Sequence, residues 1–388
     1  MSLVYSEEQQ LLADTAAEFL MAKSPVTAQR KLRDEGASGG SAAGFDAALW
    51  REMVDMGWSA IPFPEALGGL EFGCKGLGAV FEQIGRNLSA SPLLSSIVLG
   101  GSVIELTGTE AQQAEWMAAL IGGDKRIALA VDETPRHDPS AVALRAARDG
   151  DGYVLTGTKA FVADGVGADA FIVAARTGAQ AGEQGGISLF VVVADASGVQ
   201  VSPMKTLDSR NHATLVLNEV RVGAAALLGA EGEGFAALDA ALDRGRVCLA
   251  AELLGATQSL FDTTVEYLKT RVQFDVPIGS FQALQHRAAW CYAHLQLARS
   301  AVMAGLAAMD DPALDAAARA RMASLAKWKA GDAAHRISRE AVQMHGGMGV
   351  TDELDVGLHL KRIRVAQASL GDGDFHVQRY GDLSAVEA

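Results

Sequence analysis

The strongest constraint on the fold is a block of β-type sequence, residues 126–225, that no helical segment interrupts. Its short apolar runs, separated by turn residues, are 127–131, 152–162, 170–175, 187–193 and 213–222. Alternation of Tyr153 and Leu155 with Val154 and Thr156 is typical of half-buried antiparallel strands. Because a doubly wound sheet needs helices between its strands, the block predicts an antiparallel barrel or sandwich.

Helical patterns lie on both sides of this block. Before it, apolar residues recur at helical spacing from Leu11 to Leu20, and further patterns cover 74–86, 92–107 and 110–121. After it, the helical blocks are 235–271, 281–309, 312–345 and 351–368. At 388 residues the chain also exceeds what one core usually serves. We therefore predict an α+β protein with three domains, at 1–124 (helical), 125–233 (β) and 234–388 (helical).

Composition limits the partners and the compartment. The net charge is −14, with acidic residues spread along the chain, which disfavours binding to nucleic acid or to an anionic membrane surface. The three cysteines show no CxxC spacing, so we expect reduced thiols in a cytoplasmic protein. We expect no export signal at the N-terminus, and no apolar run reaches the ~18 residues of a membrane span.

Several catalytic motifs are missing from the sequence. It has no HExxH, no zinc-type Cys/His pairs, no Walker A and no GxSxG, so no metal site is predicted. The glycines of 229–235 follow the last strand and precede a long helix, without the βαβ unit that a dinucleotide-binding turn requires. This segment is interpreted as a turn that connects two domains.

Three stretches together resemble the acyl-CoA dehydrogenase family. The stretch 271–282, RVQFDVPIGSFQ, is similar to the family's R-x-Q-F-G-x-P-I-x-x-F-Q segment. Residues 343–349 resemble its Q-x-x-G-G-x-G turn, and 64–69 resemble its P-E-x-x-G-G element. Because they occur in the family's order and spacing, the resemblance covers nearly the whole chain. It implies a C-terminal four-helix bundle and FAD as cofactor.

The resemblance also implies residues that contact FAD. They are Phe161, Arg271, Phe274, Gln282, Gln343, Gly346 and Gly347. In the family the matching arginine reaches the FAD pyrophosphate of a neighbouring subunit, where a guanidinium can bind a diphosphate with two hydrogen bonds. From the residues alone, Arg271 is more simply a solvated cation at a helix end, and Gly346–Gly347 is equally a helix C-cap.

The β domain departs from the family's flavin motifs. The usual T-E-P-x-x-G-S-D is replaced by 131–139, VDETPRHDP, where Glu133 matches the motif's Glu only with a shift. The usual W-[IV]-[TS] becomes Phe161-Val162-Ala163. Phe161 can still cover a flavin ring, but Ala163 cannot supply a side-chain hydroxyl.

The family's catalytic base is a carboxylate that removes the α-proton of an acyl thioester while the β-carbon gives a hydride to flavin N5. Aligned on Gln378–Arg379, the usual Glu position holds Asp372, and the alternative position falls on Gly245. Asp is one methylene shorter than Glu, about 1.5 Å. From local sequence alone, the Gly-Asp-Gly-Asp run at 371–374 is also typical of a turn. Arg246 is the expected substrate-binding residue.

We therefore expect an FAD-dependent acyl-CoA dehydrogenase, a homotetramer that passes electrons to an electron-transfer flavoprotein or similar acceptor. Two alternatives stay open. The chain could be the partner subunit of a heteromeric acyl-CoA dehydrogenase, paired with a paralogous subunit and degenerate in its own site. It could also be a nitroalkane oxidase-like flavoenzyme, since that relative uses an aspartate base.

Overall fold

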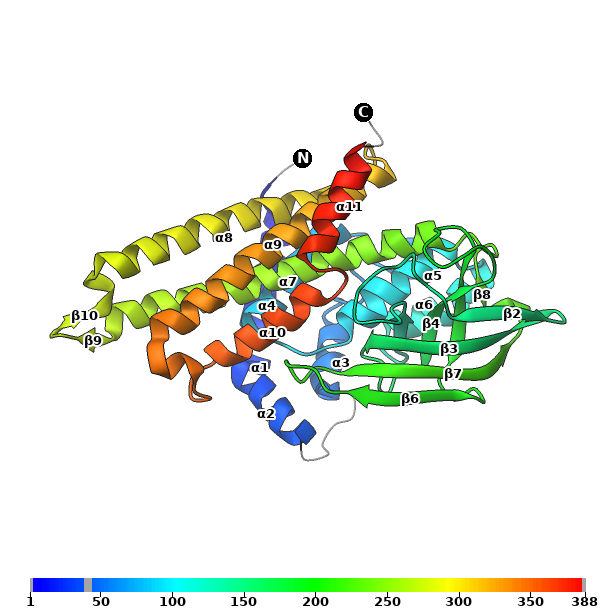
Figure 1. The fold of residues 1–388 in the computed structure, drawn as a ribbon, viewed down its shortest axis with the longest axis horizontal. Coiled ribbons are helices and arrows are strands. Elements are labelled where there is room, and N and C mark those ends of the chain that lie inside the picture. Colours follow the sequence, from blue (N-terminus) through cyan, green and yellow to red (C-terminus); the bar gives the residue numbers. More distant parts are fainter. Residues whose placement is uncertain (1–2, 38–43, 386–388) are drawn as a thin grey trace. The chain divides into compact units, whose positions relative to one another are not determined.

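The computed structural model describes residues 3–37 and 44–385 (Figure 1). The chain divides into two compact units. One, called here the helical unit, comprises Met1–Arg33, Gly73–Ser89 and Arg246–Ala388. The other, called here the mixed unit, comprises Asp34–Phe72 and Ala90–Gly245. Each unit therefore gathers segments that are distant in the sequence.

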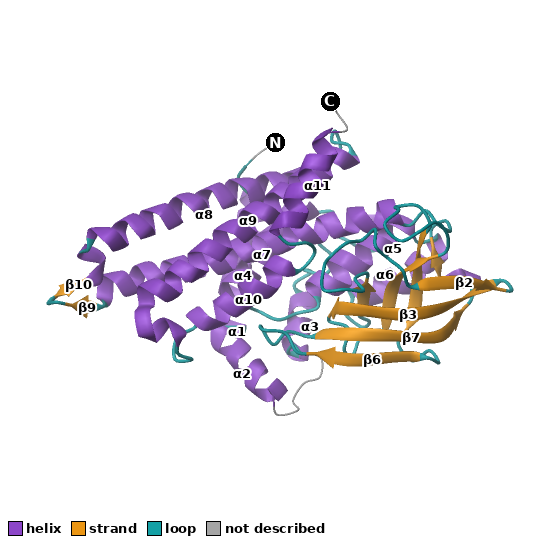
Figure 2. Cartoon of the chain, in the orientation of Figure 1, coloured by secondary structure: helices purple, strands orange, loops and turns teal. Residues whose placement is uncertain are grey.

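The helical unit is a bundle of long helices (Figure 2). Its helices are α1 (Glu7–Lys23), α4 (Gly73–Asn87), α8 (Gln282–Met309), α9 (Ala316–His345), α10 (Val356–Ala368) and α11 (Gly373–Ala385), with most of α7 (Phe235–Thr270). Helix α2 (Val26–Ala37) crosses the unit boundary in sequence, as α7 does. Helix α9 packs against α8, α10 and α11 and is the central element of the C-terminal part.

Two glycines let α4 and α7 approach closely within this unit. A Cβ atom added at Gly85 would overlap the carbonyl oxygen of Glu252, and one added at Gly255 would overlap that of Glu82. Since backbone rather than flexible side chain occupies the space, neither position accepts a side chain without separating the helices.

The mixed unit combines short helices with one eight-stranded sheet. The helical elements are α3 (Ala47–Asp55), η1 (Glu65–Leu67), the π-helix η2 (Leu93–Gly101), α5 (Ser102–Thr107), α6 (Glu110–Ile121) and η3 (Ala224–Ala226). The segment predicted to resemble P-E-x-x-G-G forms η1. It ends at Gly68, whose φ of 82° is readily adopted by glycine. Gly69 packs directly on the carbonyl of Phe63, which is fully buried.

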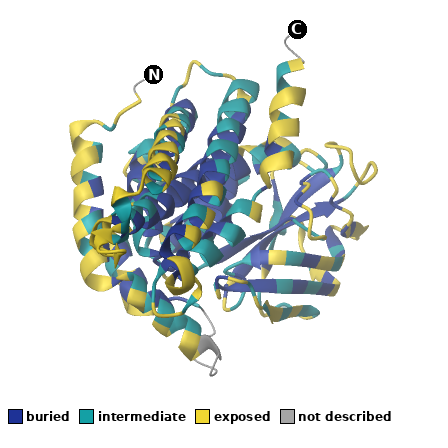
Figure 3. Ribbon diagram, turned by 60° about the vertical axis from the view of Figure 1, so that its left-hand side comes forward, coloured by how far each residue is buried: buried dark blue, intermediate teal, exposed yellow. Residues whose placement is uncertain are grey.

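The sheet runs in the order β6-β7-β3-β2-β4-β5-β8, and β1 joins it beside β4. Its strands are β1 (Ile127–Ala130), β2 (Arg145–Asp149), β3 (Gly152–Ala163), β4 (Ala170–Arg176), β5 (Ile187–Val193), β6 (Val199–Met204), β7 (His212–Val222) and β8 (Leu227–Leu228). Strand β4 is buried along its whole length, and buried positions recur on β3, β5 and β7 (Figure 3). Tyr153, Leu155, Phe171 and Phe190 belong to the core of this sheet.

The predicted fold class, with helical, β and helical parts in that order, is confirmed. The expectation of a purely antiparallel sheet is corrected, because β1 pairs with β4 in parallel and β2 meets β4 in parallel at one position. The β2–β3 hairpin lies between β1 and β4 in sequence, which lets the chain return in the same direction. The domain limits at 124/125 and 233/234 stay predictions. They fall between α6 and β1 and between β8 and α7.

In the part of the chain that the structure describes, no helix combines the length and apolar character needed to span a membrane.

The crossing of α4 and α7 generates a stability prediction. Gly255→Ala should lower the free energy of unfolding by about 3 kcal/mol, because the added methyl group overpacks a backbone contact. Gly381→Ala is the control: Gly381 lies on an exposed face of α11 with no atom within 4 Å of the added Cβ. It should stabilise the protein by about 0.5–1 kcal/mol through helix propensity alone. Urea unfolding of both variants measures the difference, and equal effects would contradict the close crossing.

Candidate active site and cofactor-binding residues

A β-bulge presents Phe161 at the surface of the mixed unit. The pairing of β3 with β7 changes register between Lys159 and Val162. Phe161 lies in this irregular stretch with a φ of 55°, and its side chain is 43% exposed. A bulge redirects a side chain that regular pleating would place elsewhere. The ring that is predicted to cover a flavin is therefore accessible to a ligand.

The same bulge is anchored by an ion pair between a buried lysine and a partly exposed glutamate. Lys159 is completely buried, and its Nζ donates hydrogen bonds to Glu133 Oε1 at 2.7 Å and to the carbonyl of Val131 at 2.9 Å. The Glu133 carboxylate also accepts the backbone N–H groups of Ala143 and Leu144. Burial lowers the pKa of Lys159 to about 8, and the charge of Glu133 opposes that shift. Glu133 thus ties three segments of the mixed unit together.

A hairpin after α7 exposes Arg271 and Phe274. Arg271 follows the last residue of α7, as predicted, and opens the small hairpin of β9 (Val272–Gln273) and β10 (Val276–Pro277). Phe274 and Asp275 both have positive φ at the hairpin tip, a backbone that closes a two-residue turn. Phe274 is 78% exposed, and Gln282, the first residue of α8, is also exposed.

The end of α9 lies beside the end of α7. Tyr267 of α7 stacks on His345, the last residue of α9, with ring centroids 4.3 Å apart. The next residues, Gly346 and Gly347, have no atom within 4 Å of an added Cβ, so a ligand can approach their backbone. Gln343 is exposed and lines a cavity of about 580 Å³ with Arg287, Trp290, His335, Arg336, Arg339 and Glu340.

These exposed groups fit a cofactor that is held from outside the subunit. They offer a guanidinium, an aromatic ring, amides and open glycine backbone at one end of the helical unit. Such groups match a diphosphate and a stacked nucleoside. The resemblance grouped Arg271, Phe274, Gln282, Gln343, Gly346 and Gly347, and the Tyr267–His345 stack brings their two segments together.

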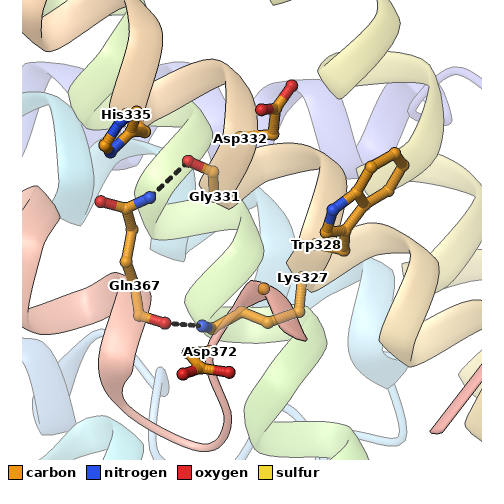
Figure 4. Close-up of a pocket in the computed structure, with 8 residues that line it drawn as sticks. Lys327, Trp328, Gly331, Asp332, His335, Gln367 and Asp372 are labelled. Atoms are coloured by element: carbon orange, nitrogen blue, oxygen red, sulfur yellow. Dashed lines mark hydrogen bonds between the residues drawn. The ribbon is translucent and has the colours of Figure 1, made fainter. Parts of the chain in front are cut away.

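Asp372 begins the last helix. It follows Leu370 and Gly371, whose φ values of 58° and 104° turn the chain sharply after α10. Asp372 Oδ1 accepts the N–H of Phe375 at 2.9 Å, the geometry of a helix N-cap. The residue is exposed, and it lines a cavity of about 160 Å³ with Lys327, Trp328, Gly331, Asp332, His335, Gln367 and Gly373 (Figure 4). Asp372 can therefore be a turn residue, as the local sequence indicates, and also the catalytic base that the resemblance implies.

A buried lysine holds the loop that carries Asp372. Lys327 Nζ donates to the carbonyl of Gln367 at 3.0 Å (Figure 4) and to that of Gly371 at 3.1 Å. Burial lowers the pKa of this amine to about 7; the positive charge of Arg246 adds to the shift, and the Asp372 carboxylate opposes it. The ammonium group therefore lies within the electrostatic influence of the candidate base.

Arg246 supports the same loop from α7. Its side chain is fully buried, its Nε donates to the carbonyl of Leu370 at 3.2 Å, and its guanidinium lies 5.3 Å from the centre of the Phe375 ring. The predicted role in substrate binding stays a prediction. These contacts are with Leu370 of the loop and with Phe375 of α11.

The two groups of site residues lie far apart along one helix. Positions 246 and 270 are 24 residues apart on α7, and a rise of 1.5 Å per residue separates them by about 36 Å. Arg271 and its neighbours are thus remote from the Asp372 loop of their own helical unit.

The sequence reasoning missed Lys159 and Lys327 as site-supporting residues. A signal for Lys327 was present, because it falls on the stripe of buried positions on α9 that includes Ala323, Ala330 and Ala334. A lysine at core spacing needs buried acceptors. Lys159 falls at a buried position of β3 in the same way.

Comparison with known proteins settles the family. Residues 6–124, 130–220 and 232–381 match, in turn, the N-terminal, middle and C-terminal domains of acyl-CoA dehydrogenase. The acyl-CoA dehydrogenase FadE27 of Mycobacterium tuberculosis is 32% identical over 345 residues, which are 87% of this chain and 88% of that protein. The chain belongs to the acyl-CoA dehydrogenase family.

Solved acyl-CoA dehydrogenase structures agree over the whole length. Butyryl-CoA dehydrogenase from Megasphaera elsdenii has a TM-score of 0.88 at 26% identity and covers 100% of both chains. The ChsE4-ChsE5 complex from Mycobacterium tuberculosis has a TM-score of 0.87 at 29% identity, with 99% of each chain covered. The predictions of an acyl-CoA dehydrogenase, an oxidoreductase that uses FAD, are confirmed. The roles of the individual site residues stay predictions.

The Lys159–Glu133 ion pair of the mixed unit can be tested by removing one charge. Glu133→Gln should lower the free energy of unfolding by about 3–5 kcal/mol, because it leaves the Lys159 ammonium buried without its counter-charge. Glu183→Gln, at an exposed position of the same unit, should change it by less than about 0.5 kcal/mol. Denaturant unfolding followed by circular dichroism measures both. Similar values would show that the pair contributes nothing specific.

Proposed function

We propose that Asp372 is the base that removes the α-proton in the FAD-dependent dehydrogenation of an acyl-CoA thioester. The observation that supports this is the loop of Asp372: two buried cations bind its carbonyl oxygens, and its carboxylate borders a cavity. The alternative family position is Gly245, which has no side chain to act as a base. A carboxylate held in one place meets the geometric requirement for proton abstraction.

Several groups of this chain then have separate roles in the reaction. The N–H of Phe375 binds Asp372 Oδ1 and orients the carboxylate, so that Oδ2 can accept the proton. Lys327 and Arg246 hold the backbone around it. Bound FAD supplies the acceptor for the hydride. Phe161 would lie against the flavin, and reoxidation by an electron-transfer flavoprotein or similar acceptor completes the cycle.

We propose further that the cofactor set of one subunit serves its neighbour in a homotetramer. The end of α7 before Arg271 lies about 36 Å along that helix from Arg246, which binds the Asp372 loop, and this separation suits a second chain. The same region exposes large apolar side chains: Val272, Phe274, Val276, Phe281, Trp290, Tyr292 and Leu297. Exposed apolar surface of this extent, from the hairpin along α8, is typical of a subunit interface.

The second candidate is the partner subunit of a heteromeric enzyme. The ChsE4-ChsE5 complex, a solved relative, favours it, as does the cap that Asp372 makes for α11. In that case the chain would lend Arg271, Phe274 and Gln343 to the FAD of a paralogous subunit. The nitroalkane oxidase alternative rests on the aspartate alone.

The catalytic proposal predicts that Asp372→Asn keeps FAD bound but loses reduction of the flavin by acyl-CoA. The amide is nearly isosteric and cannot accept the proton. Stopped-flow absorbance of the flavin band measures the rate, and nitroalkanes offered in the same assay test the oxidase alternative.

Asp374→Asn is the matched control, since Asp374 is an exposed aspartate in the first turn of the same helix. It should reduce within a few-fold of the wild-type rate. Reduction of Asp372→Asn at near the wild-type rate would reject Asp372 as the base, and a loss confined to Asp374→Asn would move the role to that residue.

The assembly proposal predicts about one FAD per subunit in a tetramer of the chain expressed alone. Arg271→Met should weaken FAD binding by about 10- to 100-fold, the value of a charge-assisted hydrogen bond. Lys269→Met removes an exposed cation two residues earlier and should leave affinity unchanged. Fluorescence titration with FAD measures the affinity and the amount bound per subunit, and light scattering measures the oligomeric state. A colourless protein that takes up no FAD would support the partner-subunit function instead.

A further inference from the structure

A fully buried amine is costly unless its surroundings satisfy it. Lys327 has acceptors in only two places that the structure records, the carbonyl oxygens of Gln367 and Gly371. The first belongs to the last turn of α10, and the second to the residue just before Asp372. The amine therefore joins the end of one helix to the start of the next across the loop 369–372.

Two successive residues of the loop have an unusual backbone conformation. Leu370 and Gly371 are both in the left-handed region, which is an uncommon conformation for leucine. Arg246 holds the carbonyl of Leu370 from the α7 side, while Lys327 holds that of Gly371 from the α9 side. The two cations thus donate hydrogen bonds to the carbonyl oxygens of two consecutive peptide groups immediately before the candidate base.

We propose that Lys327 is a positioning residue for the reaction: its ammonium group, bound to the carbonyls of Gln367 and Gly371, sets the place of the Asp372 carboxylate. The inference rests on the proposed role of Asp372. In addition, catalysis would depend on Lys327, although this cation touches neither substrate nor cofactor. The reason is that a shift of about 1 Å in a catalytic group can cost about 10²-fold in rate.

The protonation state of Lys327 should make the rate of flavin reduction depend on pH. Its pKa is lowered to about 7, so the amine is charged below that pH and neutral above it. The charged groups around it are Arg246 from α7, Arg362 from α10 and Asp372 from the loop. Asp332 and His335 of α9 line the adjoining cavity. Burial and Arg364 lower the pKa of His335, which is therefore neutral through this range. The rate of flavin reduction should fall as pH rises above about 7.

The test compares Lys327→Met and Lys327→Arg in the FAD-loaded enzyme. The methionine variant should reduce flavin about 10²-fold more slowly at saturating acyl-CoA, with KM little changed and no alkaline fall. The arginine variant keeps its charge at all accessible pH, and the adjoining cavity of about 160 Å³ gives it room. It should approach the wild-type rate and remain active above pH 7.

Lys329→Met is the control, since Lys329 lies on the same helix and packs against Trp328. It should keep the wild-type rate and pH profile. Bound FAD and the thermal midpoint are measured first. If Lys327→Met does not fold, Lys327→Arg alone tests the inference. A rate of flavin reduction that falls above pH 7 in this variant as it does in the wild type overturns the inference. So does a Lys327→Met enzyme within three-fold of wild type.

Asp372→Asn is assayed in parallel to separate the two proposals. Normal reduction by Asp372→Asn rejects the base assignment itself. An inactive Asp372→Asn beside a normal Lys327→Met rejects only the positioning role.

Discussion

The site segments of this protein depend on the satisfaction of buried cations. A charge removed from water needs acceptors, and here backbone carbonyls provide many of them. Lys327 and Arg246 bind the carbonyls that precede Asp372, and Lys159 binds Val131 next to its Glu133 partner. In the mixed unit, Arg176 donates to the carbonyls of Ser140, Val142, Glu183 and Gly185. Irregular segments thus gain fixed conformations without a hydrophobic core of their own.

Helix α7 contributes residues to two candidate functional regions at two places along its length. Near its middle it contributes Arg246 to the Asp372 loop, and at its end it presents Arg271 and the exposed hairpin. Its glycine, Gly255, lies between these regions and allows the close crossing with α4. The spacing of the helix therefore makes a single subunit hold both a candidate catalytic loop and a candidate cofactor-binding surface that lies far from it.

Sequence patterns predicted the elements whose periodicity is strong and missed those whose stability comes from neighbours. The apolar strands β3, β4 and β5 were found, whereas β2 and β6 were not. Residues of β2 are nearly all exposed, and β6, at an edge of the sheet, offers only the short alternation of Val199 and Val201 before Pro203. Helix α11 was missed because its sequence starts with glycine and aspartate turn residues, and the cap from Asp372 stabilises that start. The site residues were predicted by resemblance. The lysines that support them stand at core positions of a periodic pattern, but their acceptors follow only from the packed structure.

The way the loop is held also bears on how such an enzyme changes during evolution. Lys327 and Arg246 grip main-chain oxygens at 370 and 371, and every amino acid supplies that atom. The side chain at 372 can therefore be exchanged while its support persists. A lineage could substitute one acidic residue for another, or abandon the acid in a subunit that no longer needs it, and still inherit an intact scaffold around the position.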